Sequence, residues 1–188
     1  MSDFDEAAVK DFFDESFEYW EKLFHIAFSM LNNRDEAEDA VQDVLIKAAK
    51  KHKQFEGRSQ LYTWLVRILI NHCHDIHRKH KRQKTSSMFK QSKDGQDYGV
   101  DLEDGRQDLQ KKIELSEASL RLIEMTEKLD TIYKEVVLLR YFEEMSYAQI
   151  AEVLNISEGT VKSRLNNARR ILKSELSSLG IGEEYLAT

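Results

Sequence analysis

The sequence predicts an all-α fold of two small helical domains that a flexible polar linker joins. Three observations support this prediction: the 188 residues contain no proline, β-branched residues occur only in short runs, and apolar residues recur at helical spacing. The segment 85–110 lacks this spacing and cannot bury enough apolar surface to fold alone. We therefore expect an N-terminal domain over 1–84, a C-terminal domain over 111–180 and a tail over 181–188.

Composition narrows the class of protein. Hydrophobic residues make up 41% of the chain, enough for globular cores, and no apolar run is long enough to predict a membrane span. The single cysteine excludes an internal disulfide and the N-terminus lacks a signal-peptide pattern, so we expect a cytoplasmic protein. The net charge is -6, but basic residues gather at 78–84 and 162–173, apart from acidic groups at 35–43 and 94–108. This distribution favours DNA and a protein partner over nonspecific coating of nucleic acid.

The first helix is expected over 4–31, where aromatic residues are frequent. Four of them recur at helical spacing: Phe13, Phe17, Trp20 and Phe24. The spacing predicts that these rings lie in the core, so we assign them no role in binding. The asparagine pair that follows is expected to end the helix.

The second helix is expected from Arg34 to about Lys53. Its predicted buried stripe is Ala37, Val41, Val44, Leu45 and Ala48. The opposite face, which we call the acidic face, comprises Asp35, Asp39, Gln42, Asp43 and, in their midst, Ile46. Two interpretations stay open at this point: a solvated helix surface with one stray isoleucine, or an acidic docking surface with a hydrophobic centre.

A short loop at 55–59, with Gly57 as its flexible point, precedes a third helix expected from Gln60 to about Arg82. The predicted core stripe of this helix is Leu61, Leu65, Ile68, His72 and Ile76. A polar stripe on the same helix holds Arg67, Asn71, His74 and Arg78, with Trp64 at its border. An amide, cations and a nearby ring can contact single-stranded nucleic acid by stacking, hydrogen bonding and phosphate pairing. The alternative is a polar helix surface with a half-buried Trp64.

Three residues with metal-binding side chains, Cys73, His77 and His80, fall on one face of this helix. Helical cysteine and histidine residues can bind zinc, but nothing elsewhere in the sequence completes a set of ligands. We therefore predict neither a metal nor a cofactor. The sequence also lacks a glycine-rich phosphate loop and a plausible catalytic triad, which argues against an enzyme.

Beyond the linker, helices are expected over 111–128 and 131–143, and the second of these is expected to supply core through Val136, Leu139, Tyr141 and Phe142. Residues 146–176 then predict two helices joined by a tight turn. Ser146 and Gln149 have the spacing of a capping box at the start of the first helix. Asn155 tolerates the left-handed conformation that a helix end often requires, and Ser157 is a suitable N-cap for the second helix.

The second helix of this pair has the composition of a DNA-recognition helix. Its predicted buried stripe is Val161, Leu165, Ala168 and Leu172. The polar side chains that point away from the stripe are Thr160, Ser163, Arg164 and Asn167, flanked by the cations Lys162, Arg169, Arg170 and Lys173. Short polar side chains can reach base edges and cations can meet phosphates, so binding of duplex DNA is favoured over an ordinary helical hairpin.

Two blocks of this sequence together resemble the sigma factors of bacterial RNA polymerase, specifically the short extracytoplasmic-function group. The first block contains NRDEAEDAVQDV, the loop FEGRS and YTWLVRILINH, and the second is YAQIAEVLNISEGTVKSRLNNARRIL. The resemblance covers most of the chain. It implies a sigma factor that binds the polymerase core, directs promoter-specific initiation and has no catalytic residues of its own.

The resemblance also implies roles for the N-terminal segments. The acidic face around Ile46 aligns with the surface that docks on the clamp helices of the polymerase, which shifts its interpretation toward docking. Phe55, Gly57, Arg58 and Ser59 align with the loop that holds a base flipped out of the minus-ten element. Asn71 aligns with a residue that contacts the same element.

In the C-terminal domain, the resemblance places five residues in the helix that reads the minus-thirty-five element as duplex: Lys162, Ser163, Asn166, Asn167 and Arg170. The acidic linker resembles the segment that passes through the active cleft of the polymerase, and an anti-sigma factor is an expected further partner. Asp75 departs from the family pattern, because it puts an acid beside the DNA-facing stripe and leaves the minus-ten preference open.

The competing function is a conventional transcriptional regulator that binds an operator duplex through the same C-terminal motif. Such a protein would bind as a symmetric dimer without polymerase and would carry a sensor domain at its N-terminus. A sensor domain does not require a polar stripe of Trp64, Arg67 and Asn71 after a flexible loop. That stripe favours the sigma factor.

Overall fold

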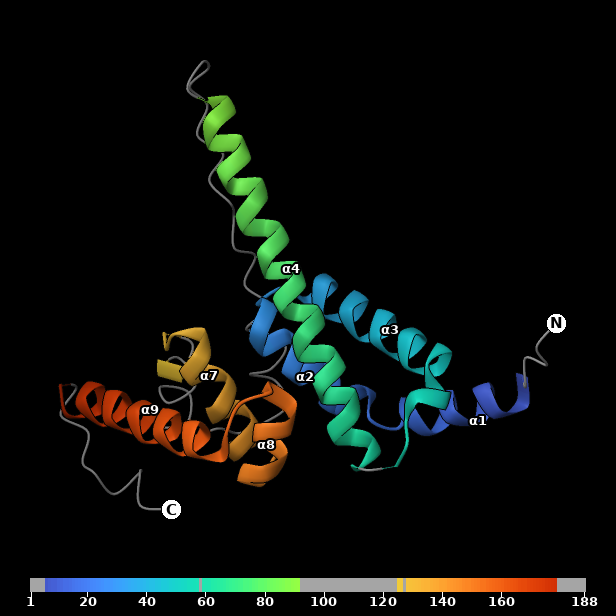
Figure 1. Ribbon diagram of the computed structural model, residues 1–188. Coiled ribbons are helices and arrows are strands. Elements are labelled where there is room, and N and C mark those ends of the chain that lie inside the picture. The colour runs from blue at the N-terminus through green and yellow to red at the C-terminus, as the bar shows by residue number, and fades with distance from the viewer. Residues whose placement is uncertain (1–5, 58, 92–124, 127, 179–188) are drawn as a thin grey trace, which may run out of the picture. The chain divides into compact units, whose positions relative to one another are not determined.

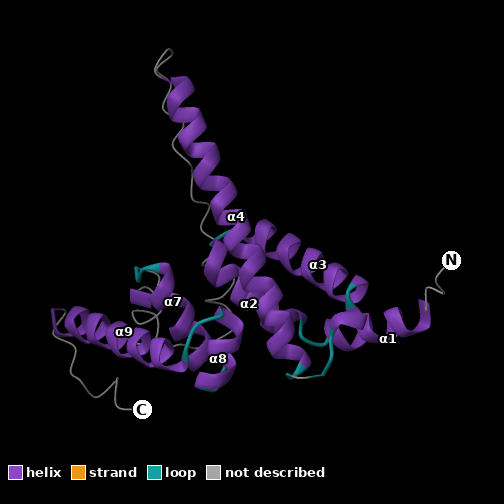
Figure 2. Cartoon of the chain, in the orientation of Figure 1, coloured by secondary structure: helices purple, strands orange, loops and turns teal. Residues whose placement is uncertain are grey.

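The computed structural model describes residues 6–57, 59–91, 125–126 and 128–178. The chain divides into two compact units, Met1–Lys112 and Ile113–Thr188, each of which is described by itself. The described residues form helices and connecting loops without a strand (Figure 2). The predicted all-α fold with two helical domains is confirmed.

The N-terminal unit begins with two helices where the sequence predicts one. Helix α1 spans Glu6–Phe17 and α2 spans Trp20–Leu31, so the expected single helix is wrong. Tyr19 lies between them, and its ring packs 5.1 Å from the ring of Tyr62 at the start of the fourth helix. This packing between distant segments interrupts a stretch whose local pattern is continuously helical.

The aromatic residues of α1 and α2 are not the core of the unit. Leu23, Ile26 and Ala27 are fully buried, whereas Phe17 is 51% exposed, and Phe13, Trp20 and Phe24 are only half-buried. The rings pack against one another along the surface, as Phe17 does with Trp20 at 5.5 Å between centroids. The aromatic and aliphatic residues share the same helical period, which is why the period alone selected the wrong set.

Helix α3 spans Arg34–Lys50, and a short 3-10 helix, η1, follows at His52–Gln54. The asparagine pair before α3 ends one helix and starts the next. Asn32 adopts the left-handed conformation with φ 52°, and the side chain of Asn33 accepts a hydrogen bond from the backbone N–H of Glu36. The predicted stripe of α3 is confirmed as buried: Ala37, Val41, Val44, Leu45 and Ala48.

Helix α4 spans Leu61–Gln91 and is longer than predicted, because neither Gly nor Pro interrupts the chain before Gly95. It packs against both α2 and α3 and then continues beyond them (Figure 1). Contact with two helices widens its buried face, which is formed by Leu65, Val66, Leu69, Ile70 and Cys73. Three members of the predicted core stripe lie at the edge of this face and are only half-buried: Ile68, His72 and Ile76.

The C-terminal unit contains α7 at Thr131–Val137, a π-helical turn η2 at Leu138–Phe142, α8 at Tyr147–Leu154 and α9 at Glu158–Ser178. The helix predicted over 111–128 lies almost entirely outside the described residues. The core prediction is confirmed for Val136 and Leu139, which are fully buried.

The core prediction is wrong for Tyr141 and Phe142, which are 42% and 54% exposed. The cause is the π-helical turn, in which the backbone N–H of Glu143 donates to the carbonyl of Leu138, five residues back. The wider turn rotates the following residues outward from the position that a regular α-helix would give them. Met145, which is 3% exposed, fills the core after the turn.

Candidate nucleic-acid interfaces

Local hydrogen bonds fix the start of α8 and the turn between α8 and α9. Ser146 and Gln149 form the predicted capping box: the Ser146 hydroxyl accepts from the Gln149 N–H at 3.2 Å, and the Gln149 side chain accepts from the Ser146 N–H at 2.8 Å. Asn155 ends α8 in the left-handed conformation, with φ 52°. Ser157 then caps α9, because its hydroxyl accepts from the Thr160 N–H at 3.1 Å. These predictions from sequence are confirmed.

Helix α9 buries one face and exposes the polar one. The predicted stripe of Val161, Leu165, Ala168 and Leu172 is buried. Among the predicted DNA contacts, Lys162, Ser163, Asn166 and Arg170 are exposed, and Thr160, Arg164 and Asn167 are half-buried. The hydroxyls of Thr160 and Ser163 bond within the first turn of α9, to the Ser157 hydroxyl and the Thr160 carbonyl respectively. Amides and cations therefore dominate the outward surface further along.

One cation of α9 is held against the π-helical turn. The Arg169 Nε–H donates to the Tyr141 hydroxyl at 2.6 Å, and the guanidinium lies 5.7 Å from the centre of the Tyr141 ring. The neighbouring Arg170 is exposed and carries no such contact. The two adjacent arginines thus differ: one ties α9 to the turn before α8, and the other faces solvent.

In the N-terminal unit, the loop after α3 is built around two aromatic residues and one glycine. The Phe55 ring lies 5.5 Å from the Trp64 ring in the first turns of α4, and both rings are half-buried. Gly57 has φ +67°, and a Cβ added there would meet nothing within 4 Å. Ser59 is half-buried, and Arg58 lies outside the described residues. The structure therefore brings the predicted loop beside Trp64.

The predicted polar stripe of α4 is on the surface. Arg67, Asn71 and Arg78 are exposed, and His74 is half-buried. The Asn71 amide donates to the Arg67 carbonyl at 2.9 Å, which orients the side chain along the helix. Arg78 forms an ion pair with Asp75, and its hydrogen bond holds the pKa of that carboxyl below the ordinary value. Asp75 therefore neutralises part of the positive charge of the stripe.

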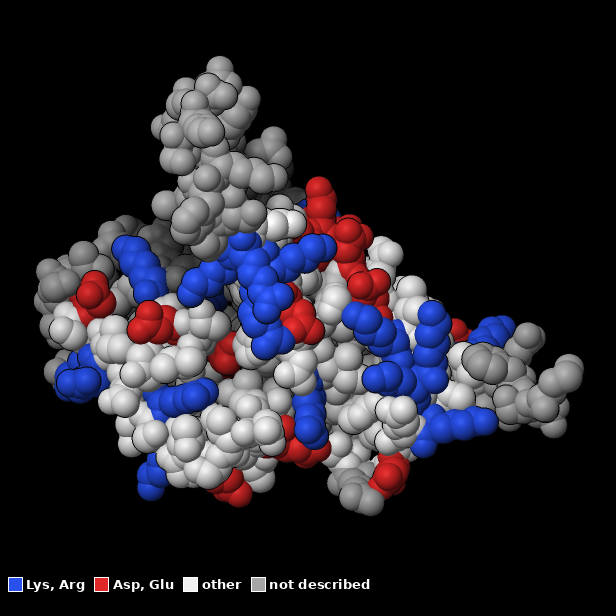
Figure 3. Space-filling model, turned by 45° about the horizontal axis from the view of Figure 1, so that its top comes forward, with Lys and Arg blue, Asp and Glu red and all other residues white. Residues whose placement is uncertain are grey.

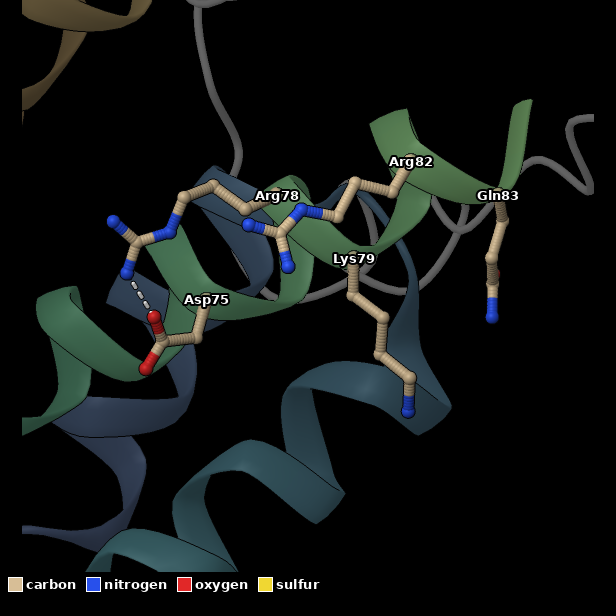
Figure 4. A pocket seen from close by; sticks show the side chains of 5 residues that line it. All are labelled: Asp75, Arg78, Lys79, Arg82 and Gln83. Carbon is tan, nitrogen blue, oxygen red and sulfur yellow. Dashed lines mark hydrogen bonds and ion pairs between the residues drawn. The ribbon is translucent and has the colours of Figure 1, made fainter. Parts of the chain in front are cut away.

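The sequence analysis placed two further cations of α4 in the basic group at 78–84 but assigned them no binding role. Lys79 and Arg82 line an open hollow together with Asp75, Arg78 and Gln83, all of them from one helix (Figure 4). The cations recur at spacings of three and four residues, and this was the signal that the prediction passed over. The hollow extends the basic surface of α4 beyond Arg78. On the visible face of the chain, acidic side chains lie beside and between the basic ones (Figure 3).

The acidic face of α3 has the exposure that the sequence predicts. Asp35, Asp39, Gln42 and Asp43 are exposed, and Ile46 at their centre is 46% exposed. An exposed isoleucine among carboxylates gives the face an apolar centre with a charged rim, as in many protein interfaces. The face therefore has the composition of a docking surface.

One residue of the acidic face reaches α4. An Oδ of Asp43 lies 3.4 Å from Nε2 of His72, and Nζ of Lys47 lies 3.0 Å from Nδ1 of the same ring. An ammonium group can only donate, so Nδ1 accepts and Nε2 carries the proton toward Asp43. Burial, and then the charge of Lys47, hold the pKa of His72 below its ordinary value, against the opposing effect of Asp43 and Asp75.

The three residues with metal-binding side chains on α4 have other contacts. Cys73 is fully buried. Nε2 of His77 donates to the Met30 carbonyl at 2.9 Å, and Nε2 of His80 lies 3.1 Å from a carboxylate oxygen of Glu36. No group of three or more His, Cys, Asp or Glu residues is arranged to hold a metal within the described ranges. No helix in the described part of the chain is long and apolar enough to cross a membrane.

Comparison with known proteins identifies both units. The family described as Sigma-70 region 2 matches residues 18–83, and the family described as Sigma-70, region 4 matches residues 119–172. The chain is 32% identical over 165 residues to the ECF RNA polymerase sigma factor SigW of Bacillus subtilis, covering 86% of each protein. The chain belongs to the extracytoplasmic-function (ECF) sigma factors.

Other ECF sigma factors support the assignment. The ECF RNA polymerase sigma-E factor of Haemophilus influenzae is 30% identical over 154 residues, covering 78% of each protein. The sigma factor RpoE of Bartonella quintana, solved in complex with the anti-sigma factor NepR, aligns with a TM-score of 0.70 and 28% identity over 89% of this chain and 98% of that one. As an ECF sigma factor, the protein serves promoter-specific transcription initiation by RNA polymerase, and it is not an enzyme.

Proposed function

We propose that this sigma factor reads the minus-thirty-five element as duplex through α9 and the minus-ten element as a melted strand through the loop at 55–59 and α4. The observation that carries the proposal is the presence of two different polar surfaces, one in each compact unit. Helix α9 presents amides and cations on one exposed face, as a major-groove helix does. Helix α4 presents an amide, cations and a half-buried ring beside a loop, as single-strand readers do.

The energies of base extrusion and stacking support separate roles for the two surfaces. Extruding a base from a duplex costs a few kcal/mol. Stacking on an aromatic side chain recovers about 1–3 kcal/mol per base. Phe55, Trp64 and Asn71 supply stacking and hydrogen bonding on the N-terminal unit, while the cations of α9 hold the upstream duplex. The polymerase core joins the two contacts by raising their effective concentration on one promoter.

The acidic face of α3 is the proposed docking surface for the polymerase core. Asp35, Asp39, Gln42 and Asp43 surround the exposed Ile46, so a basic partner surface with an apolar centre would complement the face. The solved relative from Bartonella quintana is held by an anti-sigma factor. We propose that an anti-sigma factor also regulates this protein in the cytoplasm, by covering surfaces that the polymerase needs.

The deciding experiment is run-off transcription with core polymerase on genomic fragments, with and without the full chain. A promoter found in this way is then used for permanganate footprinting, which measures opening of the minus-ten region. Asn71→Ala is expected to reduce opening while polymerase association stays at the wild-type level. Equal loss of both activities would reject the assignment of α4 to the melted strand.

Two further variants test the other surfaces. Arg170→Ala is expected to weaken upstream duplex binding and to lower the slope of log affinity against log salt by about one. Lys51→Ala serves as the control cation.

Asp35→Arg combined with Asp39→Arg is expected to abolish co-purification with core polymerase through like-charge repulsion, while the contacts of Asp43 with α4 remain. Binding of a closed palindromic duplex without polymerase would instead favour the conventional regulator.

A further inference from the structure

Three aromatic rings from three separate segments meet at the base of the loop. Phe12 comes from α1, Phe55 from the loop and Trp64 from the beginning of α4. The Phe12 ring lies 6.1 Å from each of the other two rings, which are themselves 5.5 Å apart. The contact between Phe12 and Trp64 is edge-to-face, with 85° between the ring planes. We call these three residues the aromatic cluster.

The cluster connects α1 to both sides of the loop. On the entry side, the Phe55 N–H donates to the His52 carbonyl at 3.0 Å, and the His52 ring lies 6.2 Å from Phe12. On the exit side, the Trp64 N–H donates to the Gln60 carbonyl at 3.2 Å in the first turn of α4. These backbone bonds are local to each side. Phe12 contacts residues on both sides, so it packs against both members of the Phe55–Trp64 pair.

We propose that Phe12 is a positioning residue for the melted strand: it holds Phe55 and Trp64 in the arrangement that receives an extruded base. The inference rests on the proposed function of the loop and α4. A pocket for a flipped base must be preformed, because ordering loose side chains would consume the energy that stacking returns. An edge-to-face contact restricts the orientation of the Trp64 ring as well as its position. Helix α1 thereby becomes part of the strand-binding apparatus.

The adjacent Phe13 provides a matched control. Consecutive residues of a helix point about 100° apart, so Phe12 and Phe13 face different surroundings. Phe13 stacks on Phe17 of the same helix at 6.1 Å, and this ring contact does not involve the loop. Both side chains are half-buried. Replacing either one removes a similar amount of aromatic surface from the same helix, but only Phe12 acts on the cluster.

The first experiment compares Phe12→Leu, Phe12→Tyr and Phe13→Leu in the full chain with core polymerase. We expect Phe12→Leu to reduce permanganate reactivity of the minus-ten strand about tenfold, while polymerase association and upstream duplex binding stay unchanged. Phe12→Tyr keeps the ring and is expected to retain opening, as is Phe13→Leu. Wild-type opening by a folded Phe12→Leu protein overturns the inference. Equal losses in Phe12→Leu and Phe13→Leu also overturn it, because they indicate general destabilisation of α1.

The second experiment reports on ring geometry directly. The chain has two tryptophans, so Trp20→Phe leaves Trp64 as the sole indole emitter. In that background Phe12→Leu is expected to shift the Trp64 emission and to weaken its quenching by single-stranded minus-ten DNA, whereas Phe13→Leu leaves both unchanged. An identical spectrum and identical quenching in both variants contradicts a positioning role.

Failure of the inference can be separated from failure of the proposed function. Phe55→Ala and Trp64→Ala remove the surfaces that would touch the base. If they leave opening intact, the loop and α4 do not bind the melted strand, and the proposed function is wrong. If they abolish opening while Phe12→Leu has no effect, the proposed function stands and the role of Phe12 is rejected.

Discussion

The two surfaces of this sigma factor that we propose bind DNA are built in opposite ways. The α8–α9 pair is fixed by residues within a few positions of one another, as in the Ser146–Gln149 capping box at the start of α8 and the Ser157 cap of α9. The loop surface of the N-terminal unit is assembled from α1, the loop and α4. A helix that enters a groove needs only to be presented rigidly, whereas a surface for unstacked bases must combine several segments.

The same contrast applies to electrostatics. On α9, Lys162 and Arg170 are exposed, and Arg169 bonds to Tyr141. On α4 the acids lie among the cations: Asp75 pairs with Arg78, and Asp43 reaches His72 from α3. The positive charge of the α4 surface is therefore partly neutralised by neighbouring carboxylates.

The largest expected effect comes from truncating a core leucine in each unit. Leu65 and Leu165 are 0% and 1% exposed, so replacing either with alanine should cost about 2–5 kcal/mol of stability in its own unit. Hydrogen exchange of the full chain should show lost protection in α2–α4 for Leu65→Ala and in α7–α9 for Leu165→Ala. Equal loss across both units in either variant would mean that the two units unfold together.

Removing a cap should have a smaller effect that is confined to the helix pair. Ser157→Ala takes away the acceptor of the Thr160 N–H and should lower the stability of the C-terminal unit by about 1 kcal/mol. Ser174→Ala, an exposed position within α9, is the matched control and should leave stability unchanged. The free energy of unfolding from denaturant titration, and then the affinity for upstream duplex, are measured for both variants. Equal stabilities for the two variants would refute local control of the turn.

Removing the acid from the α4 stripe should strengthen DNA binding slightly. Asp75→Asn releases Arg78 from its ion pair and should raise affinity for single-stranded DNA about two- to threefold at low salt, because an exposed pair is worth little. Asp14→Asn changes the net charge equally at a distant exposed position. If Asp14→Asn gives the same gain, net charge rather than Arg78 is responsible. Arg78→Ala should cancel the gain of Asp75→Asn.

The smallest expected effect is a pH dependence at the contact between α3 and α4. The pKa of His72 is lowered in the folded state, so the unfolded chain binds this proton more readily. The stabilising effect of the neutral ring is present above the ordinary histidine pKa and is lost as pH falls below it. His72→Gln should therefore flatten the decline of melting temperature between pH 7.5 and pH 5.5. If the melting temperature of His72→Gln changes with pH as steeply as that of the wild type, His72 does not contribute to the loss of stability in acid.

The sequence alone predicted the parts of the molecule that depend on neighbouring residues. Asn155, Ser157 and the capping box follow from spacing, and the exposed Ile46 follows from the period of α3. The break at Tyr19 did not follow, because it depends on packing against Tyr62 in a distant helix. The π-helical turn that exposes Phe142 has no marker in composition.

The same distinction explains the candidate sites. The residues predicted on α9 face outward as expected, since one buried stripe determines that helix. The role proposed for Phe12 could not be inferred from its own helix, where it is one aromatic residue among several. Its significance lies in contacts with Phe55 and Trp64, more than forty positions away in the chain. Local patterns carry no record of such contacts.

Gly57 illustrates a requirement of chirality rather than of size. Its φ of +67° disfavours L-residues, yet the space where a Cβ would project holds no atom within 4 Å. Asparagine tolerates this backbone conformation, so Gly57→Asn should destabilise the loop less than Gly57→Ala does. The β-branched Gly57→Val should destabilise it most. A D-alanine introduced by chemical ligation would adopt this φ without the strain that an L-residue meets there.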